Sequence, residues 1–443
     1  MPRDDQPART GTPTALQPVA PSGRRMNRSA VLWVTLAVFA QESVWNFYDA
    51  QVPVQLRQYI TSAGVVGLVM GMDNVLGVLV QPGMGYLSDR LAGGRLGRWP
   101  IITAGACLAA VPFALIPWTV GLPALLACVL GFALIANMFK GVTETLVSDY
   151  VAPEHRSRAQ GFVKAGVSLT IVVSSLISLL VVDRSLTLAF AIPALLLPAM
   201  IGVSWLFLGR RHTRAALVRQ PAADGPATPR LSSPWAVVKD LVRDPSRARL
   251  LLMLGIFCFA GTWSALRSLL TPYGTEVLGL SRGQAGGLAL PGAVAFLLAV
   301  VPIAYASRRL GEVRAIQYGI ALFLLGLLAG FAVPNGVVTT ASMVMTSVGY
   351  AAFAVNALVA LWNLAPDDRV LGTYTGLYTV ASASAAALGP ALLGVTVDIT
   401  GWRFMFLNAA VFGAVALTVF TSLARRRPPV PAAPGNSTGR NGS

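Results

Sequence analysis

Charged residues are scarce in this sequence, and the residue types of common catalytic and metal sites are nearly absent. Only 12% of the 443 residues are charged, and there are 2 histidines and 3 cysteines. A soluble protein carries about a quarter charged residues. Together with 55% hydrophobic residues and a mean hydropathy of +0.64, this composition excludes an ordinary soluble domain. It indicates a protein that crosses a membrane many times.

The few cysteines and histidines show no arrangement that chemistry requires. Cys107, Cys128 and Cys258 lie inside apolar stretches at no metal-binding spacing, so we read them as small buried hydrophobic residues without a disulfide. His155 and His212 lie in loops without neighbouring ligand residues. The chain also lacks a GxxxxGK[ST] phosphate loop and a recognisable Ser/His/Asp set. We therefore expect no enzyme activity, no cofactor, no metal and no ATP-driven transport.

Twelve apolar stretches, each long enough to cross a bilayer in about 20 residues, dominate the chain. They predict an all-α integral membrane protein. The expected spans are 30–56, 63–87, 100–118, 122–149, 159–182, 185–208, 250–273, 284–306, 312–332, 336–363, 372–396 and 402–423.

The polar segments divide these spans into two groups of six. Residues 1–29 have no cleavable apolar region and, like the tail 424–443, have the composition of a disordered segment. We expect six-helix bundles at 30–208 and 250–423, joined by a linker at 209–249 that contains a short amphipathic helix on the membrane surface.

The basic residues predict the orientation of the chain in the membrane. Of the 34 lysines and arginines, 27 fall on the face that also carries both termini. By the positive-inside rule this face is cytoplasmic, and the protein lies in the plasma membrane. The net charge of +16 therefore reflects topology, and we expect lipid but no nucleic acid as a partner. The opposite face carries Arg57, Arg184, Arg282 and Arg403, and the remaining three cations, Lys140, Lys164 and Arg267, fall within spans.

The two halves of the chain look related. Short stretches of the first half recur in the second at nearly constant offsets of 218, 219 and 213 residues. Because Trp45 then matches Trp263, Asp49 falls opposite Arg267. The other matched pairs are residues 85–91 with 304–310 and residues 152–156 with 365–369. Parallel repeats of this kind place a substrate site near the middle of the membrane, between the halves.

The loop after the second span carries a further pattern. Glycines at 83 and 85 let a neighbouring helix approach closely, and Asp89 can meet an adjacent helix N-terminus and an arginine of the same loop. The layout resembles the signature loop of the major facilitator superfamily, which implies a twelve-helix carrier of two six-helix pseudo-repeats. The alternative is a charged turn that only marks the cytoplasmic face. The conformational latch expected here and after the fourth span comprises Gly85, Asp89, Arg90, Arg98, Asp149 and Arg156.

The second and fourth spans resemble a narrower group of carriers. Asp73-Asn74 followed by Gln81-Pro82, and Phe139-Lys140 followed by Asp149, are similar to the glycoside–pentoside–hexuronide cation symporters and the sucrose-transporter-like carriers. The resemblance implies uptake of a sugar with a cation, which is usually a proton in the sucrose-like branch. Gln81 replaces an aspartate of the sodium-coupled members, so a proton is favoured over sodium.

Acidic residues in the first two spans are candidates for coupling. Glu42 and Asp49 share one helix face with Trp45 and Asn46. A carboxylate shielded from water can take up and release a proton near neutral pH, and tryptophan can stack on a sugar. Alternatively, Asp49 lies near the outer membrane surface. Asp73, with Asn74 beside it, is the second coupling candidate or a polar lock between helices.

Other charged and polar residues within the spans are expected to pair or bind substrate, because an isolated charge in a membrane is costly. Lys140 and Glu144, four residues apart, predict an ion pair on one helix face, either structural or switchable. Arg267 is expected to pair with Asp49 across the two halves or to bind an anionic substrate. Trp263 and Asn356 complete the expected site.

These features predict a secondary transporter that imports a small polar solute, such as a sugar or glycoside, with a proton or sodium ion by alternating access. One alternative is proton-coupled efflux of a drug or metabolite. Another is a non-transporting membrane sensor with a carrier fold, in which the charges within the spans would be dispensable.

Overall fold

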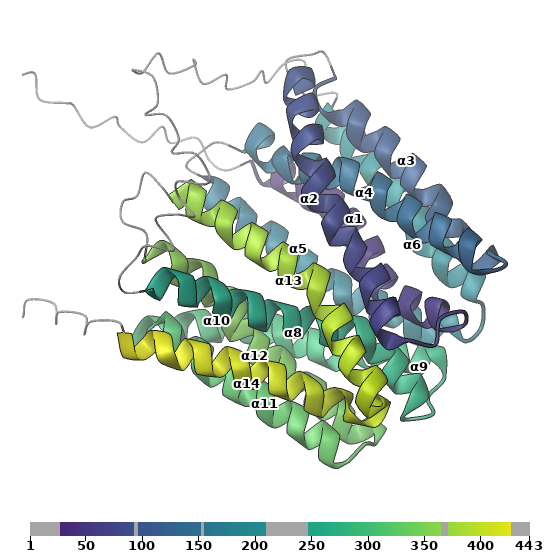
Figure 1. Cartoon of the computed structure of the whole chain (residues 1–443). Helices are drawn as coiled ribbons and strands as arrows, with labels where there is room; N and C mark the ends of the chain where they lie inside the picture. Colours follow the sequence, from purple (N-terminus) through teal and green to yellow (C-terminus); the bar gives the residue numbers. More distant parts are fainter. Residues whose placement is uncertain (1–26, 93–95, 152–154, 210–246, 365–370, 427–443) are drawn as a thin grey trace, which may run out of the picture.

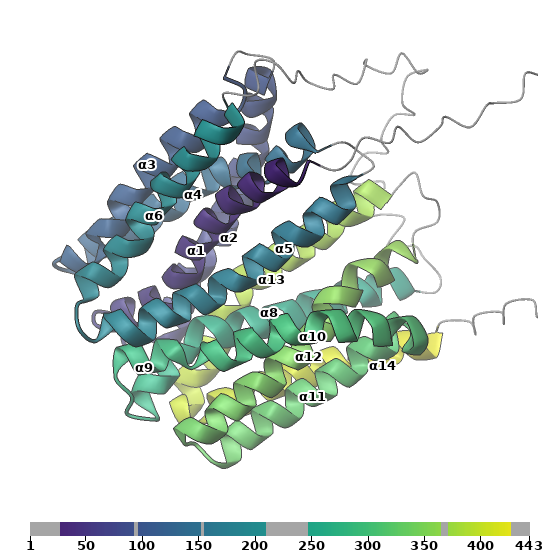
Figure 2. The ribbon, with the colours of Figure 1, turned by 180° about the vertical axis from the view of Figure 1, so that it is seen from behind.

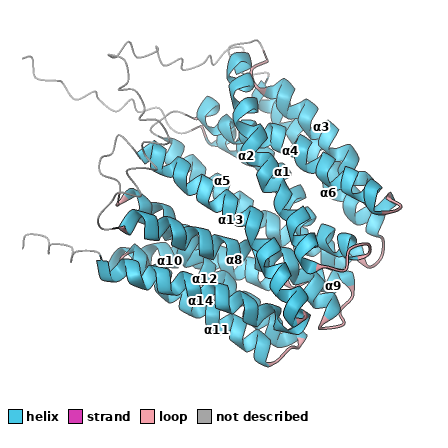
Figure 3. Cartoon of the chain, in the orientation of Figure 1, coloured by secondary structure: helices cyan, strands magenta, loops and turns pink. Residues whose placement is uncertain are grey.

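The computed structural model describes residues 27–92, 96–151, 155–209, 247–364 and 371–426. These residues form helices joined by turns, and no strand occurs among them (Figure 3). Twelve described helices are long and apolar enough to cross a membrane, so the expected all-α membrane fold is confirmed. The expected linker helix and most of both terminal segments lie outside the described residues.

The helices lie close to the expected spans, and several extend one or two turns beyond the apolar stretch. The eighth span is built from two helices, α9 and α10, and the fifth ends in a π-helical turn, η3. The helices are α1 (Arg28–Arg57), α2 (Ala63–Ala92), α3 (Trp99–Leu115), α4 (Leu122–Tyr150), α5 (Arg156–Ile177), η3 (Ser178–Val182), α6 (Leu186–Leu208), α8 (Ala248–Glu276), α9 (Arg282–Gly287), α10 (Ala289–Leu310), α11 (Glu312–Ala332), α12 (Gly336–Trp362), α13 (Leu371–Thr400) and α14 (Met405–Arg426).

Polar residues at the helix starts explain where several of these helices begin. The Oδ1 atom of Asn27 accepts a hydrogen bond from the backbone N–H of Ala30 at the start of α1, over 3.2 Å. Ser185 begins α6 in the same way, and Ser281 forms a capping box with Gln284 at α9. Each cap satisfies an N–H group that the first helical turn leaves without a partner.

The helices α1–α6 and α8–α14 form two bundles (Figures 1 and 2). Aromatic rings fill the interior of each bundle. Lipid tails are as apolar as these side chains, so close packing contributes more here than removal from water. The largest fully buried rings include Phe47, Phe113, Phe132 and Phe190 in the first bundle, and Phe259, Phe323, Phe353 and Phe406 in the second.

The molecule has two unlike ends. We call the end where α1 begins and α14 ends the basic end, and the end where α1 gives way to α2 the sealed end. In Figure 1 the bundles converge at the sealed end, where α9 lies. The described hydrogen bonds and ion pairs between the bundles all lie at the sealed end or at the level of Asn46 and Arg267.

Glycines let α2 and α13 touch at the sealed end only. A Cβ atom on Gly67 would overlap the backbone carbonyl of Pro390, and one on Gly394 would overlap that of Ala63. Nearer the basic end, Gly83 and Gly85 have nothing within 4 Å of the position a Cβ would take. The expectation that these two glycines admit a neighbouring helix is therefore wrong for this conformation, because the bundles have separated at their level.

We predict that Gly67→Val lowers the apparent Tm by about 5 °C, since the new side chain meets backbone atoms of Pro390 that cannot rotate away. Thermal unfolding of the purified protein in detergent measures this effect. Gly83→Val on the same helix is the matched control, and its Tm should stay within about 1 °C of the wild type. Equal losses in both variants would contradict the close packing of α2 on α13.

Candidate functional site

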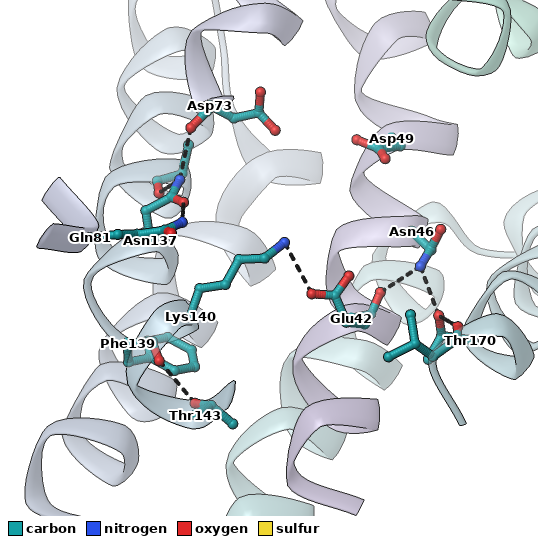
Figure 4. Close-up of polar contacts among 12 residues, drawn as sticks. Glu42, Asn46, Asp49, Asp73, Gln81, Asn137, Phe139, Lys140, Thr143 and Thr170 are labelled. Atoms are coloured by element: carbon teal, nitrogen blue, oxygen red, sulfur yellow. Dashed lines mark hydrogen bonds and ion pairs between the residues drawn. The ribbon is translucent and has the colours of Figure 1, made fainter. Parts of the chain in front are cut away.

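Six charged side chains form one electrostatic network between the helices. Figure 4 shows four of them, Glu42, Asp49, Asp73 and Lys140. Two ion pairs organise it. The Nζ atom of Lys140 lies 3.0 Å from Oε1 of Glu42, and Nη2 of Arg267 lies 3.6 Å from Oδ2 of Asp49. The network comprises Glu42 and Asp49 on α1, Asp73 on α2, Lys140 and Glu144 on α4, and Arg267 on α8.

The partner of Lys140 differs from the one we predicted. Within the described residues, Lys140 forms its ion pair with Glu42 on α1 and not with Glu144 on its own helix. The side chain of Lys140 passes over the ring of Trp45, 5.4 Å from its centroid, to reach that carboxylate. Glu144 lies on the same helix nearer the basic end and is exposed. A pair between helices gives the lysine a partly buried partner, 17% exposed, which the exposed Glu144 does not offer.

Arg267 connects the two bundles, as the internal repeat predicts. Besides its ion pair with Asp49, it donates a hydrogen bond to Oδ1 of Asn46 over 2.6 Å. The amide nitrogen of Asn46 in turn donates to the hydroxyl of Thr170 on α5 over 2.8 Å. Asn46 thus has both ends of its amide engaged and joins α1, α5 and α8. Its role in substrate binding stays a prediction.

Asp73 faces the space between α2 and α1, on the side toward Asp49 (Figure 4). One of its carboxylate oxygens accepts two hydrogen bonds from its neighbour, Asn74. Its backbone carbonyl accepts a hydrogen bond from Asn137 on α4, and Oδ1 of Asn137 accepts one from Gln81. Asn137 therefore holds α2 against α4 at the level of the network.

Sequence reasoning missed Asn137 and Thr170, and also Tyr48. Tyr48 is fully buried beside Asp49 and Asp73, and its hydroxyl has no hydrogen-bond partner among the described residues. A polar residue three positions before Lys140 in an apolar span was the available signal for Asn137. For Tyr48 the signal was its position directly before Asp49.

The two tryptophans of the expected site differ in their exposure. Trp45 is 6% exposed and packs against Tyr48 and Phe132, so its ring is covered in this conformation and its stacking on a sugar stays a prediction. Trp263 is only partly buried and lies parallel to the ring of Tyr350, with centroids 4.2 Å apart. The second bundle therefore presents a stacked aromatic surface, whereas Trp45 belongs to the packing of the first.

A pocket lies where the two bundles meet, with about 360 Å³ of space between atoms, part of it open to solvent. Asp49 and Arg267 stand on its wall together with hydroxyl groups that the sequence did not single out. Its lining comprises Asn46, Asp49, Ala50, Ile171, Ser174, Ser175, Arg267, Leu270, Thr271, Gly286 and Ala289. A small molecule here would contact both bundles and both members of the ion pair.

Asn356 lies outside the lining of this pocket and bonds within the second bundle, so its role in the site stays a prediction. It is 3% exposed, and its amide nitrogen donates to the hydroxyl of Ser307 on α10 over 2.8 Å and to the carbonyl of Ala352. These bonds hold α10 against α12. Asn363, which shares the helix face, binds Glu312 at the helix end.

The expected latch forms around Arg98 at the basic end. Its guanidinium lies 2.6 Å from Asp89 and 3.0 Å from Asp149, and it donates to the hydroxyl of Ser88 over 2.5 Å. One arginine thereby ties the end of α2 to the end of α4 in the same bundle. Its role in the transport cycle stays a prediction.

Three other residues expected in the latch contribute differently. Arg156 donates to the backbone carbonyls of Ser148 and Val151 and so closes the end of α4. Arg90 is exposed and binds Tyr86 one turn earlier on its own helix, so it does not join Arg98. Gly85 contributes its carbonyl to Ser88, without contacting a neighbouring helix.

Comparison with known protein families agrees with this fold. The model of the Major Facilitator Superfamily matches residues 29–336 and 292–442. Three solved structures that resemble the chain share its fold, with TM-scores of 0.71, 0.70 and 0.66 at 16%, 12% and 14% identity. The first is a bacterial homolog of the human lysosomal transporter Spinster in an inward-facing, unoccupied conformation, and the match covers 91% of this chain and 99% of that one. The second is the nucleoside transporter NupG, with 89% and 99% of the two chains covered. The third is the peptide transporter POT with sulfate, with 90% and 95% covered.

Curated relatives match over short segments. The methylenomycin A resistance protein of Bacillus subtilis (strain 168) is 31% identical over 109 residues, which are 25% of this chain and 23% of the relative. The multidrug resistance protein Stp of Mycobacterium tuberculosis (strain ATCC 25618 / H37Rv) is 30% identical over 107 residues, 24% of this chain and 20% of that one. The chain thus matches about a quarter or less of the length of either relative.

We predict that Glu42 and Lys140 are energetically coupled. Glu42→Gln and Lys140→Gln should each lower the apparent Tm because each leaves a charge unpaired among helices. The double variant should be more stable than the sum of the single losses implies, by about 1–3 kcal/mol. A thermal-unfolding cycle measures the coupling.

The cycle of Glu144→Gln with Lys140→Gln is the control for this prediction, and its coupling should stay below about 0.5 kcal/mol. A stronger coupling of Lys140 to Glu144 than to Glu42 would contradict the observed pairing.

Proposed function

Because the chain belongs to the Major Facilitator Superfamily, we propose that it is a proton-coupled secondary transporter that exports small organic solutes carrying a positive charge. The family consists of carriers rather than enzymes, and the substrate of such a carrier is a small molecule that enters from water or lipid. The single observation that supports a cationic substrate is the charge balance of the network between the helices.

The network has more acids than bases. Four carboxylates, those of Glu42, Asp49, Asp73 and Glu144, face two cations, and both cations already lie in ion pairs. An ionised carboxylate away from water is costly unless a positive charge neutralises it. Asp73 has only the amide groups of Asn74 on its carboxylate in the described part of the chain. The network therefore favours binding of further positive charge, either as protons or as an organic cation.

Competition between these two cations for the same carboxylates couples their movements. A substrate that enters while Asp49 and Asp73 are ionised displaces protons, and protons that enter from the other side displace the substrate. Such a cycle exchanges one for the other. Where protons are more concentrated outside the cell, exchange drives the substrate outward. The names of the two short-segment relatives, which are resistance proteins, are in keeping with export.

The pocket suits an amphipathic molecule. Carboxylate and hydroxyl groups line it toward α1 and α5, and Ile171, Leu270 and Ala289 supply apolar surface. The carboxylate of Asp49 can bind the charge of an organic cation while the apolar side chains contact its hydrocarbon part. Arg267 forms an ion pair with Asp49, and a bound cation would replace Arg267 as the partner of that carboxylate.

We infer that the basic end faces the cytoplasm of the cell whose plasma membrane holds the protein. The positive-inside count supports this orientation. The described conformation is then closed toward the outside and separated toward the cytoplasm, which is the state that would accept a substrate for export.

Proton-driven import of a sugar or another polar solute is the second candidate. It is favoured by the hydroxyl groups of Ser174, Ser175 and Thr271 in the pocket. The burial of Trp45 in this conformation gives that proposal less support. A sensor that does not transport would instead tolerate loss of the network carboxylates, so one set of variants separates all three functions.

We predict that adding tetraphenylphosphonium or ethidium to proteoliposomes with an acidic lumen raises the lumen pH, because protons leave as the cation enters. Asp49→Asn and Asp73→Asn should each slow this exchange at least about tenfold, since each removes a shared binding carboxylate. A pH-sensitive dye in the lumen records the rate.

Glu312→Gln is the matched control, because this carboxylate binds Asn363 at a helix end and lies outside the network. It should exchange protons at the wild-type rate. Proton movement into the lumen together with a labelled sugar, and none with the cations, would overturn export in favour of import. Unchanged activity of the Asp49 and Asp73 variants would contradict coupling through the network.

A further inference from the structure

Two aspartates at the sealed end each bind the start of a helix in the opposite bundle. Asp398 lies in the last turn of α13. Its carboxylate accepts hydrogen bonds from the hydroxyl of Ser62 over 2.6 Å and from the backbone N–H groups of Ala63 and Gly64 over 2.6 and 2.9 Å. The first turn of α2 is thus capped by a residue 334 positions away in the chain. A carboxylate suits this position because the helix N-terminus carries partial positive charge.

Asp183, which follows η3, makes the reciprocal contact. Its carboxylate accepts hydrogen bonds from the hydroxyl of Ser281 over 2.5 Å and from the backbone N–H of Gly283 over 2.7 Å. It therefore caps α9, the first helix of the eighth span, which belongs to the second bundle. Both glycines sit close against the capping aspartates. A Cβ on Gly283 would lie 2.6 Å from Oδ2 of Asp183, and one on Gly64 would lie 3.1 Å from Oδ2 of Asp398.

The two caps are related by the internal repeat. The receiving segments are Ser62-Ala63-Gly64 and Ser281-Arg282-Gly283, which share the Ser-x-Gly pattern at an offset of 219 residues. The same offset separates Arg57 from Glu276, whose side chains form an ion pair of 2.8 Å between the bundles. Equivalent residues of two repeats can touch each other only near the axis that relates the repeats. The sealed end therefore has an ion pair at its axis and one cap on either side of it.

We propose that Asp183 and Asp398 form a paired latch that sets how readily the sealed end opens, and that both caps must break in each transport cycle. The proposal rests on the transport function proposed above. Opening of the sealed end separates α13 from α2 and η3 from α9. Each separation leaves a helix start without its acceptor and a carboxylate without its donors. The capped state is stabilised by these bonds relative to the open state, whereas the bonds within each bundle persist in both.

The caps differ in this respect from the other helix caps at the same end. Ser185 accepts from Leu188, and Asn335 accepts from Val338, each within a single bundle. Loss of these caps weakens a helix in both states equally, so it should leave the opening equilibrium unchanged. This difference supplies matched controls of the same chemical kind.

The test measures the distance between spin labels at Val120→Cys and Val337→Cys, which are 89% and 81% exposed and lie on different bundles at the sealed end. Cys107, Cys128 and Cys258 are replaced by serine, and the full chain is held in lipid nanodiscs without substrate or gradient. Asp183→Ala or Asp398→Ala should each raise the ratio of the long-distance to the short-distance population about fivefold, as expected for loss of one cap. The double variant should raise it roughly by the product of the single effects.

Removal of the receiving hydroxyls by Ser62→Ala and Ser281→Ala should shift the populations in the same direction, and this arm remains if an aspartate variant does not fold. Ser185→Ala and Asn335→Ala should leave the distances as in the parent. Unshifted distances in both arms, or equal shifts in the controls, would overturn the latch. Because the readout needs neither substrate nor protons, failure to transport organic cations would overturn the proposed function and leave the latch result standing.

Discussion

A positive charge within a membrane bundle requires a partner, and this constraint on Arg267 shapes the site. Its ion pair with Asp49 and its hydrogen bond to Asn46 cross from the second bundle to the first. Because Arg267 pairs with Asp49 and Lys140 pairs with Glu42, the remaining carboxylates form no ion pair with a basic side chain in the described part of the chain. The excess of acid follows from the same pairing that holds the bundles together. A further positive charge that enters the pocket then has two ways to bind. It can replace the basic side chain that pairs with a carboxylate, or it can bind a carboxylate that has no ion pair.

This arrangement connects the chemistry of the pocket to the contacts at the sealed end. The ion pair of Arg267 with Asp49 and the ion pair of Arg57 with Glu276 both join α1 to α8. Neutralising Asp49 by a proton or a cation weakens the inner pair, and the seal then depends on the outer pair, the aspartate caps and the glycine contacts of α2 with α13. Contacts of this kind are made or lost together when rigid bundles rotate, so the molecule has discrete states rather than a continuous range.

The fold could be predicted almost wholly from the sequence, because membrane spans are set by length and hydropathy. The Asp49–Arg267 pair was predictable too, since the repeat offset placed equivalent residues opposite each other. Partners chosen by packing between non-equivalent helices were not. Lys140 forms its ion pair with Glu42 rather than with Glu144, four residues along its own helix. The amide of Asn356 on α12 donates a hydrogen bond to Ser307 on α10. Asp183 and Asp398 were not predictable, because nothing local marks a carboxylate that caps a helix 98 or more residues away in the chain.

The central claim is that protons and an organic cation compete for the same carboxylates. Proton release on binding tests it most directly, with the purified protein in weakly buffered detergent and a pH indicator. Addition of tetraphenylphosphonium should release protons in proportion to the cation bound, and the release should fall in Asp73→Asn relative to the wild type and to Glu312→Gln. Binding of the cation without proton release would contradict the account, because the two would then occupy independent sites.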